Sequence, residues 1–224
     1  MAVTTRGNLR PLLTTGRDDL LNGLRHYDLW GRLGLLEVKR RYRRTIIGPF
    51  WSAISLGVFV AVMGTVGMGL WKQEASEYLP FLASGMMVWL MISTIITESC
   101  ILFISGQYLF SRIRIDYSML AYALVWRNIV AFMHNLAVYL LIVVLLAPKL
   151  INTATLLFIP GLFIVAVNAV WVALLLGMVC CRFRDVQQLV TTILQISIFV
   201  TPIFWSPDLL SGSTRLVFVD FNPL

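Results

Sequence analysis

Five long stretches of the chain are almost entirely apolar, and polar residues gather in the short segments between them. The apolar stretches cover about residues 49–71, 79–105, 125–147, 154–180 and 188–205. Each contains close to the roughly 20 apolar residues that an α-helix needs to cross a bilayer. The pattern therefore predicts an all-α polytopic membrane protein, in which residues 49–205 form a transmembrane bundle of five spans.

A different pattern precedes the first span, in the predicted tail of residues 1–48. Between residues 18 and 38, Leu29, Leu33 and Leu36 recur at helical spacing, while charged residues occupy the opposite face. This pattern is typical of an amphipathic helix that lies in the plane of the membrane. The alternative is a helix that packs against another soluble domain.

The last stretch of the chain, residues 206–224, is half apolar and is interrupted by Pro207, Gly212 and Pro223. These breaks make it too irregular to span a membrane, and irregular backbone survives at membrane depth only where protein or water satisfies it. We expect an outward-facing re-entrant or interfacial hairpin. Because the segment ends on an apolar residue, we also expect a sixth span to follow beyond Leu224.

Composition and charge narrow the class of protein. Hydrophobic residues make up 58% of the 224 residues and charged residues 13%, whereas soluble domains contain about a half and about a quarter. The net charge of +7 would suit a nucleic acid partner, but most of the basic excess lies before residue 49, beside the first span. Basic segments that flank a span mark the cytoplasmic side. We therefore expect a cytoplasmic N-terminus and contacts with membrane lipids, not with nucleic acid.

The chain carries no motif of an enzyme. It has no phosphate-binding loop for a nucleotide, no cluster of residues at metal-ligand spacing and no nucleophile in a recognisable context. The three cysteines lie in or beside apolar runs, where free cysteine is usually a packing residue. We predict no catalytic, cofactor-binding or metal-binding residues in this chain.

Polar residues inside the predicted spans are a separate signal, because each is costly at membrane depth. Glu98 lies late in the second span and Arg127 early in the third, so both are expected near the cytoplasmic end. They either pair with each other or extend separately to the interface. The third span also contains Asn128, next to Arg127, and His134 and Asn135 at greater depth. For His134 an interhelical hydrogen bond is favoured over a role in proton relay.

Three further residues are candidates for the path of a substrate. Trp89 and Trp171 lie well inside their spans, unlike the aromatic residues near the span ends. Ordinary packing is the favoured interpretation, and a lining along which sugar rings slide is the functional one. Pro202, near the outer end of the fifth span, is expected to kink that helix. A kink there would suit a gate, although it could equally have no role.

Four stretches resemble the membrane subunits of ABC exporters of the ABC-2 type that move lipid-linked polysaccharide. Each motif is loose, but together they follow in order over nearly the whole chain, and the similarity is greatest to O-antigen exporters, with capsule and teichoic acid exporters as near neighbours. One departure is Leu56, where many members have proline. The stretches are RYRRTIIGPFW (41–51), YLPFLASGMMVWLMIS (78–93), VWRNIVAFMHNLAVY (125–139) and RFRDVQQLVTTILQISIFVTPIFW (182–205) with NPL (222–224).

The resemblance implies an architecture and partners. It implies six spans, outer re-entrant helices after the fifth, and an interfacial helix at about 18–38. It also implies a homodimer of permeases in the bacterial inner membrane, paired with a separate ATPase subunit that holds ATP and magnesium. A cytoplasmic coupling helix is expected at about 111–120, and its candidate contact residues are Ser111, Arg112, Arg114, Asp116 and Tyr117.

The function implied is ATP-driven export of a lipid-linked polysaccharide. The basic segment before the first span would then form an elbow, with Gly48-Pro49 as its turn, beside an anionic lipid pyrophosphate. The candidate headgroup residues are Arg40, Arg41, Arg43 and Arg44. Three alternatives stay open: an ABC-2 permease for a small amphiphile or drug, a proton-coupled secondary transporter and a membrane-embedded transferase.

Overall fold

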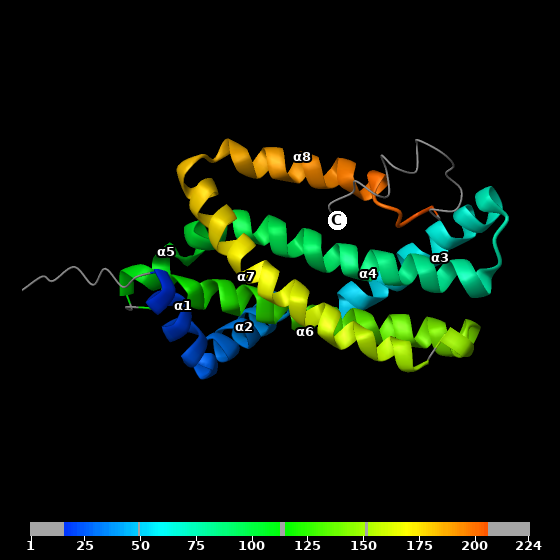
Figure 1. Cartoon of the computed structure of the whole chain (residues 1–224), viewed down its shortest axis with the longest axis horizontal. Helices are drawn as coiled ribbons and strands as arrows, with labels where there is room; N and C mark the ends of the chain where they lie inside the picture. The colour runs from blue at the N-terminus through cyan, green and yellow to red at the C-terminus, as the bar shows by residue number, and fades with distance from the viewer. Residues whose placement is uncertain (1–15, 49, 113–114, 151, 206–224) are drawn as a thin grey trace, which may run out of the picture.

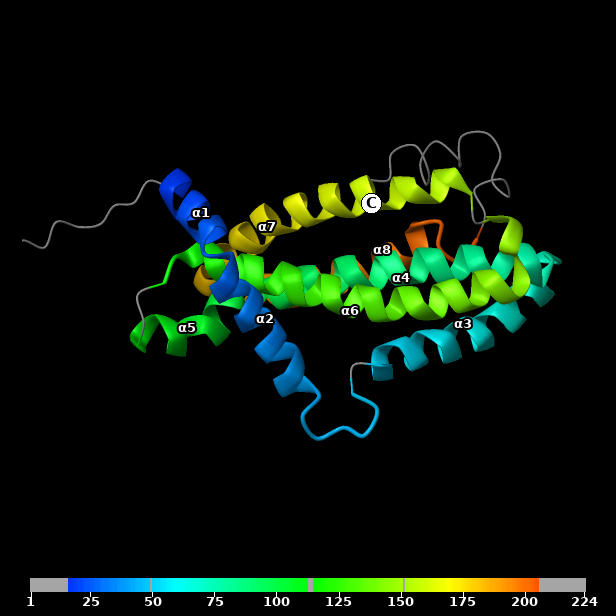
Figure 2. The same cartoon turned by 90° about the horizontal axis from the view of Figure 1, so that it is seen from below.

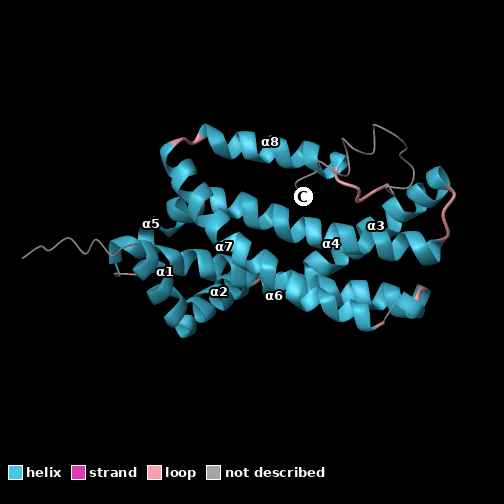
Figure 3. Ribbon diagram, viewed as in Figure 1, coloured by secondary structure: helices cyan, strands magenta, loops and turns pink. Residues whose placement is uncertain are grey.

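The computed structural model describes residues 16–48, 50–112, 115–150 and 152–205. Most residues in these ranges are helical, and the helices form one elongated bundle (Figures 1 and 3). The elements in chain order are α1 (Gly16–Arg25), α2 (Tyr27–Arg41), α3 (Phe50–Trp71), α4 (Ala75–Cys100), α5 (Leu102–Arg112), α6 (Tyr117–Leu146), the 3₁₀ turns η1 (Pro148–Leu150) and η2 (Thr153–Leu157), α7 (Phe158–Arg182) and α8 (Asp185–Val200).

Four of the described helices are long and apolar enough to cross a membrane. They are α3, α4, α6 and α7, the last counted from Thr155. The predicted fifth span corresponds to α8, an apolar helix of 16 residues. At a rise of about 1.5 Å per residue it is about 24 Å long, against a hydrocarbon core of about 30 Å. The chain is an all-α polytopic membrane protein, as its apolar pattern predicts.

Helix α4 lies at the centre of the bundle and contacts α3, α6, α7 and α8. Alanine occupies three of the tightest positions: Ala83 on α4, Ala121 on α6 and Ala173 on α7 are all completely buried. Small residues let membrane helices approach closely, and van der Waals packing then drives their association. Small residues therefore occupy fully buried positions on three helices that pack against one another.

The predicted helix of residues 18–38 is two helices in the structure. α1 ends at Arg25 and α2 begins at Tyr27, with the break at His26. Both helices pack along α6, and their buried residues are Gly23 and Gly34. Each helix brings its own glycine onto α6, where a Cβ atom at Gly23 would collide with the Ser118 hydroxyl and one at Gly34 with the Ala123 carbonyl. Apolar periodicity continues across His26 and so gives no sign of the break.

The predicted boundaries between the second and third spans are wrong. α4 ends at Cys100, a turn follows at Ile101, and α5 occupies Leu102–Arg112. A helix over 111–120 is excluded because Asp116 has extended backbone angles, φ −68° and ψ 141°, and caps a new helix that begins at Tyr117. The helical element between these spans is α5, which the continuous apolar sequence merges with the end of α4.

The predicted kink at Pro202 is also wrong, because the helix ends before the proline. Thr201 has φ −73° and ψ 136° and closes α8 after Val200. Proline disfavours the helical conformation in the residue before it. The chain then turns back onto α4, where the Tyr78 hydroxyl donates a hydrogen bond of 2.9 Å to the carbonyl of Phe204. Residues 206–224, the predicted outer hairpin, and residues 1–15 lie outside the described residues.

Candidate functional site

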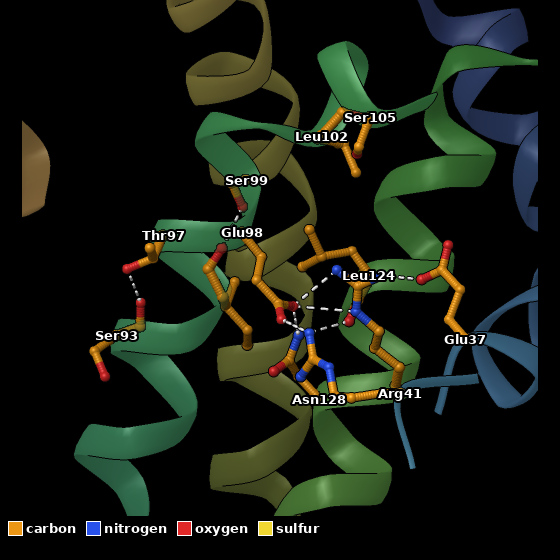
Figure 4. Close-up of polar contacts among 12 residues, drawn as sticks. Glu37, Arg41, Ser93, Thr97, Glu98, Ser99, Leu102, Ser105, Leu124 and Asn128 are labelled. Carbon is orange, nitrogen blue, oxygen red and sulfur yellow. Dashed lines mark hydrogen bonds and ion pairs between the residues drawn. The ribbon is translucent and has the colours of Figure 1, made fainter. Parts of the chain in front are cut away.

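A cluster of ion pairs joins α2, α4 and α6 (Figure 4). At its centre is Glu98 of α4. Its Oε2 accepts hydrogen bonds from Arg127 Nη2 at 2.8 Å, Arg127 Nε at 3.1 Å and Asn128 Nδ2 at 3.0 Å. Its Oε1 accepts from Arg41 Nη2, and Arg127 Nη1 donates to Glu37 Oε2. We call these five residues the Glu98 cluster.

The local sequence explains how the cluster assembles. Glu37 and Arg41 are four residues apart on α2, so they lie on one face of that helix. Arg127 and Asn128 are consecutive on α6, and both reach Glu98 near the end of α4. Thus α2 contributes one charge of each sign, α4 contributes a carboxylate and α6 a guanidinium group, and these charges meet in one cluster. Moving any one of these helices relative to the others would separate opposite charges.

Burial makes the central pair strong and leaves Arg41 accessible. The exposed side-chain fractions are 12% for Glu98, 18% for Arg127 and 52% for Arg41. Removing two charges from water is costly, and good geometry with additional hydrogen bonds offsets that cost. Asn128 supplies such a bond to Glu98. The hydrogen bond to Glu98 raises the pKa of Arg41, with partial burial opposing it, so Arg41 stays charged.

A groove of about 1130 Å³ runs alongside the Glu98 cluster, between α2, α4, α5 and α6. Five basic side chains and two carboxylates line it. Within the described ranges the two carboxylates are engaged in the cluster, whereas Lys39, Arg40 and Arg43 form no ion pair. The groove therefore has a surplus of positive charge, which favours anionic ligands. In the same ranges no group of three His, Cys, Asp or Glu side chains is placed to hold a metal ion.

The candidate arginines of the basic segment differ in their placement. Arg40, Arg41 and Arg43 line the groove, whereas Arg44 is an exposed residue of the turn that follows α2. The connection from α2 to α3 then swings away from the bundle (Figure 2). It turns at Gly48, whose φ of +64° is a conformation that favours glycine. The predicted elbow is present up to Gly48, and Pro49 lies outside the described residues.

A second contact fixes α1 to the start of α6. Both carboxylate oxygens of Asp19 accept hydrogen bonds of 2.9 Å, one from the backbone N–H of Tyr117 and one from that of Ser118. The Ser118 hydroxyl donates to the carbonyl of Asp19 at 2.7 Å. The first N–H groups of a helix have no partner within it. Asp19 therefore caps α6 from another helix, and its negative charge favours the helix N-terminus.

Replacing Asp19 by alanine is expected to lower the free energy of unfolding by about 1 kcal/mol, the usual cost of losing such a cap. Denaturant titration of the purified protein in micelles measures this change. Asp28→Ala is the matched control, because Asp28 is exposed on α2 and forms no ion pair within the described residues. Equal stabilities of the two variants would contradict the capping role.

The predicted coupling residues lie around the junction of α5 and α6. Ser111 and Arg112 end α5, Asp116 precedes α6, and Tyr117 is its first residue. Arg114 lies outside the described residues. The ring of Tyr117 is exposed while its N–H is held by Asp19. The junction is therefore tied to α1, and a force on either of these elements would reach the other.

The two candidate lining tryptophans occupy different places. Trp89 is 7% exposed and lines a groove of about 500 Å³ between α4 and α8, with Ser93, Thr97 and Gln195. Trp171 is on α7, is 55% exposed, and donates to Asn168 Oδ1 at 3.1 Å within the same helix. The structure does not bring the two rings to one lining. Only Trp89 borders a groove with hydroxyl and amide groups.

His134 and Asn135 have no shared role in the structure. Within the described residues His134 shows an intrahelical contact and not the favoured interhelical hydrogen bond: its Nδ1 lies 2.7 Å from the carbonyl oxygen of Val130 in its own helix. Its ring also packs edge-on against Phe50, with centroids 5.1 Å apart, and lines the groove beside the Glu98 cluster. Asn135 is buried, and within the described residues its Oδ1 has no hydrogen-bond partner.

Sequence reasoning identified the Glu98 and Arg127 pair as one of two options but missed two carboxylates of the site, Asp19 and Glu37. Asp19 and Glu37 lie on helices that look uniformly amphipathic, and nothing in their local sequence indicates which carboxylate faces the bundle. Asn128 was visible as a polar residue that directly follows Arg127 inside an apolar run, but the sequence alone assigned it no partner. An amide beside an intramembrane cation is a natural further donor to the same carboxylate.

Comparison with known proteins places the chain among transporters. A family model described as ABC-2 type transporter matches residues 31–224. Two curated relatives are each called O-antigen export system permease protein RfbA, one from Klebsiella pneumoniae and one from Myxococcus xanthus. They are 21% identical to the chain over 192 and 190 residues, which is 84% of this chain and 72% of each relative.

Proposed function

Because the chain belongs to the ABC-2 type transporter family, we propose that it is the permease subunit of an ATP-driven exporter for lipid-linked polysaccharide of the O-antigen kind. As a member of this family it is a transport subunit. The substrate class is supported by the names of the two relatives. The observation that carries the proposal is the basic groove beside α2, which suits the anionic end of a lipid-linked glycan.

The proposal assigns the groove to the cytoplasmic side of the bacterial inner membrane. Its support is the concentration of Lys and Arg before residue 49, since basic flanks mark the cytoplasmic face. A lipid pyrophosphate in the inner leaflet would then meet Arg40, Arg41 and Arg43 at the edge of the bundle. The same charges attract anionic lipids, with about 1 kcal/mol for each basic residue near the surface.

Energy for export comes, in this proposal, from a separate ATPase subunit that holds ATP and magnesium. Its contact would be the junction of α5 and α6, where Tyr117 is exposed and the adjacent backbone is held by Asp19. Closure of the ATPase subunits would push on this junction and, through α1 and α2, on the Glu98 cluster. Two permeases would form the complete exporter, with the glycan passing Trp89.

The headgroup role is tested by neutralising two cations that have no partner in the Glu98 cluster. In the double variant Arg40→Gln/Arg43→Gln we expect export to fall about tenfold or more, since hydrogen bonds to charged groups contribute about 1.5–3 kcal/mol each. The measurement is surface polysaccharide in cells that depend on this permease, at matched amounts of membrane-inserted protein. Arg25→Gln/Arg32→Gln is the control, because these two arginines are exposed and lie outside the groove. Normal export by the Arg40/Arg43 variant would show that the groove does not bind the headgroup.

The partner is tested by purification of the permease from its native membranes. We expect an ATPase subunit to co-purify and its hydrolysis rate to rise when lipid-linked glycan is added. A rise with small cationic amphiphiles, and none with the glycan, would instead indicate a permease for a drug-like substrate.

A further inference from the structure

Arg41 is held by Glu98 in a manner that makes it the exchangeable member of the Glu98 cluster. Glu98 uses Oε1 for Arg41 alone, whereas Oε2 receives three hydrogen bonds from Arg127 and Asn128 of α6. If Arg41 left, Glu98 would keep a charged partner and an amide donor. Arg127 would keep both carboxylates. No buried charge would be left alone, so the departure of Arg41 costs little.

The position of Arg41 suits exchange as well. It is the last residue of α2, and half of its side chain is exposed in the groove. Lys39, Arg40 and Arg43 lie beside it along the same groove. An anion that enters the groove therefore meets three cations that form no ion pair within the described residues, and a fourth, Arg41, that is already bound to a carboxylate. Guanidinium groups bind phosphoryl oxygens in the same forked geometry that they use for carboxylates.

We infer that the groove is a diphosphate site in which the Glu98 carboxylate occupies Arg41 until a phosphoryl group replaces it. This inference rests on the proposed function and names the part of the substrate that the site recognises. The ligand chemistry is a diphosphate, carried by a lipid or free in solution. Displacement of Glu98 frees the end of α2 next to the Tyr42–Gly48 connection, while Glu37 keeps the preceding turn of α2 on Arg127. Binding of the ligand thereby releases the C-terminal end of α2 from α4.

If Glu98 and the diphosphate compete for Arg41, the Glu98→Gln variant should bind diphosphate differently from the wild type. Removing the competing charge is expected to tighten diphosphate binding about two- to fivefold, the range that partly exposed ion pairs contribute. Glu37→Gln is the matched control, because it removes the same charge from the same groove but does not contact Arg41. The double variant Arg41→Gln/Glu98→Gln should lose the gain, since the two residues are coupled.

The experiment titrates the full chain, reconstituted in lipid nanodiscs, with farnesyl diphosphate, inorganic pyrophosphate and farnesol. Tighter binding of both diphosphates by Glu98→Gln than by Glu37→Gln, lost in the double variant, is the expected result. Farnesyl diphosphate binding more tightly than pyrophosphate, with the same order of variants, identifies a lipid-borne ligand; equal affinities identify a free diphosphate. Equal gains for Glu98→Gln and Glu37→Gln would show a bulk charge effect and overturn the inference, as would binding of farnesol alone.

Glu98→Asp covers the case in which Glu98→Gln does not fold. Aspartate keeps the charge that Arg127 requires and shortens the reach to Arg41, so it should also tighten binding. An affinity equal to that of the wild type would count against competition. Polysaccharide export by the wild-type chain is scored separately. Export together with equal gains for the two glutamine variants defeats the inference alone, whereas no export by the wild type defeats the proposed function.

Discussion

We expect Glu98→Ala to lower the free energy of unfolding by about 3–5 kcal/mol, the usual cost of removing one partner from a buried ion pair. Glu98 is 12% exposed and Arg127 is 18% exposed. Without Glu98, Arg127 keeps only Glu37, and Asn128 loses its carboxylate acceptor. The ties of α2 and α6 to α4 would weaken together. Equilibrium unfolding in mixed micelles, with an increasing fraction of denaturing detergent, measures the change.

The control for this variant is Glu77→Ala on the same helix. Glu77 is exposed near the opposite end of α4, and surface substitutions away from special features usually change stability by no more than about 0.5 kcal/mol. Equal stabilities of the Glu98→Ala and Glu77→Ala proteins would show that the cluster does not hold the helices together.

The second large effect concerns Gly34, where α2 meets α6. A Cβ atom at this position would lie 2.9 Å from the carbonyl oxygen of Ala123 and 3.0 Å from Cδ1 of Trp126. The carbonyl belongs to the α6 backbone and cannot turn aside as the tip of a side chain would. Gly34→Ala is therefore expected to lift α2 from α6 and to destabilise the protein by about 1–3 kcal/mol, as overpacking does.

Gly31 provides a control of opposite sign on the same helix. Nothing lies within 4 Å of a Cβ at Gly31, and alanine within a helix is favoured over glycine by about 0.5–1 kcal/mol. Gly31→Ala should therefore stabilise the protein slightly, while Gly34→Ala destabilises it, in the same unfolding assay. Stabilisation by both substitutions would mean that α2 does not pack on α6 as the structure shows.

The apolar pattern located the long helices well because membrane spans are set by length and composition. α3 and α7 differ from their predicted ranges by only a few residues. The same pattern failed where an apolar stretch contains a break. Leu102 and Phe103 continue the apolar run of α4, so composition could not show the turn at Ile101. The break at His26 was hidden in the same way, because both sides of it are amphipathic.

The candidate site was only partly predictable for a different reason. Glu98 and Arg127 were conspicuous because charges inside apolar runs are rare. The residues around them depend on how the helices pack, and a single sequence does not determine which helix faces pack together. Arg41 looked like one of several equivalent arginines, yet only its position on α2 reaches Glu98. Pro202 was expected to kink α8, but the helix ends at Val200 before the proline, because proline disfavours helical backbone in the residue before it.

The most direct measurement of the central claim is transport in proteoliposomes that contain this permease and its co-purified ATPase subunit. Radiolabelled lipid-linked glycan is added on the side of the ATPase, and its appearance inside is followed. We predict accumulation with ATP and magnesium, none with a non-hydrolysable ATP analogue, and a strongly reduced rate for Arg40→Gln/Arg43→Gln. Accumulation driven by a proton gradient without ATP, or movement of small amphiphiles but not of the glycan, would contradict the account.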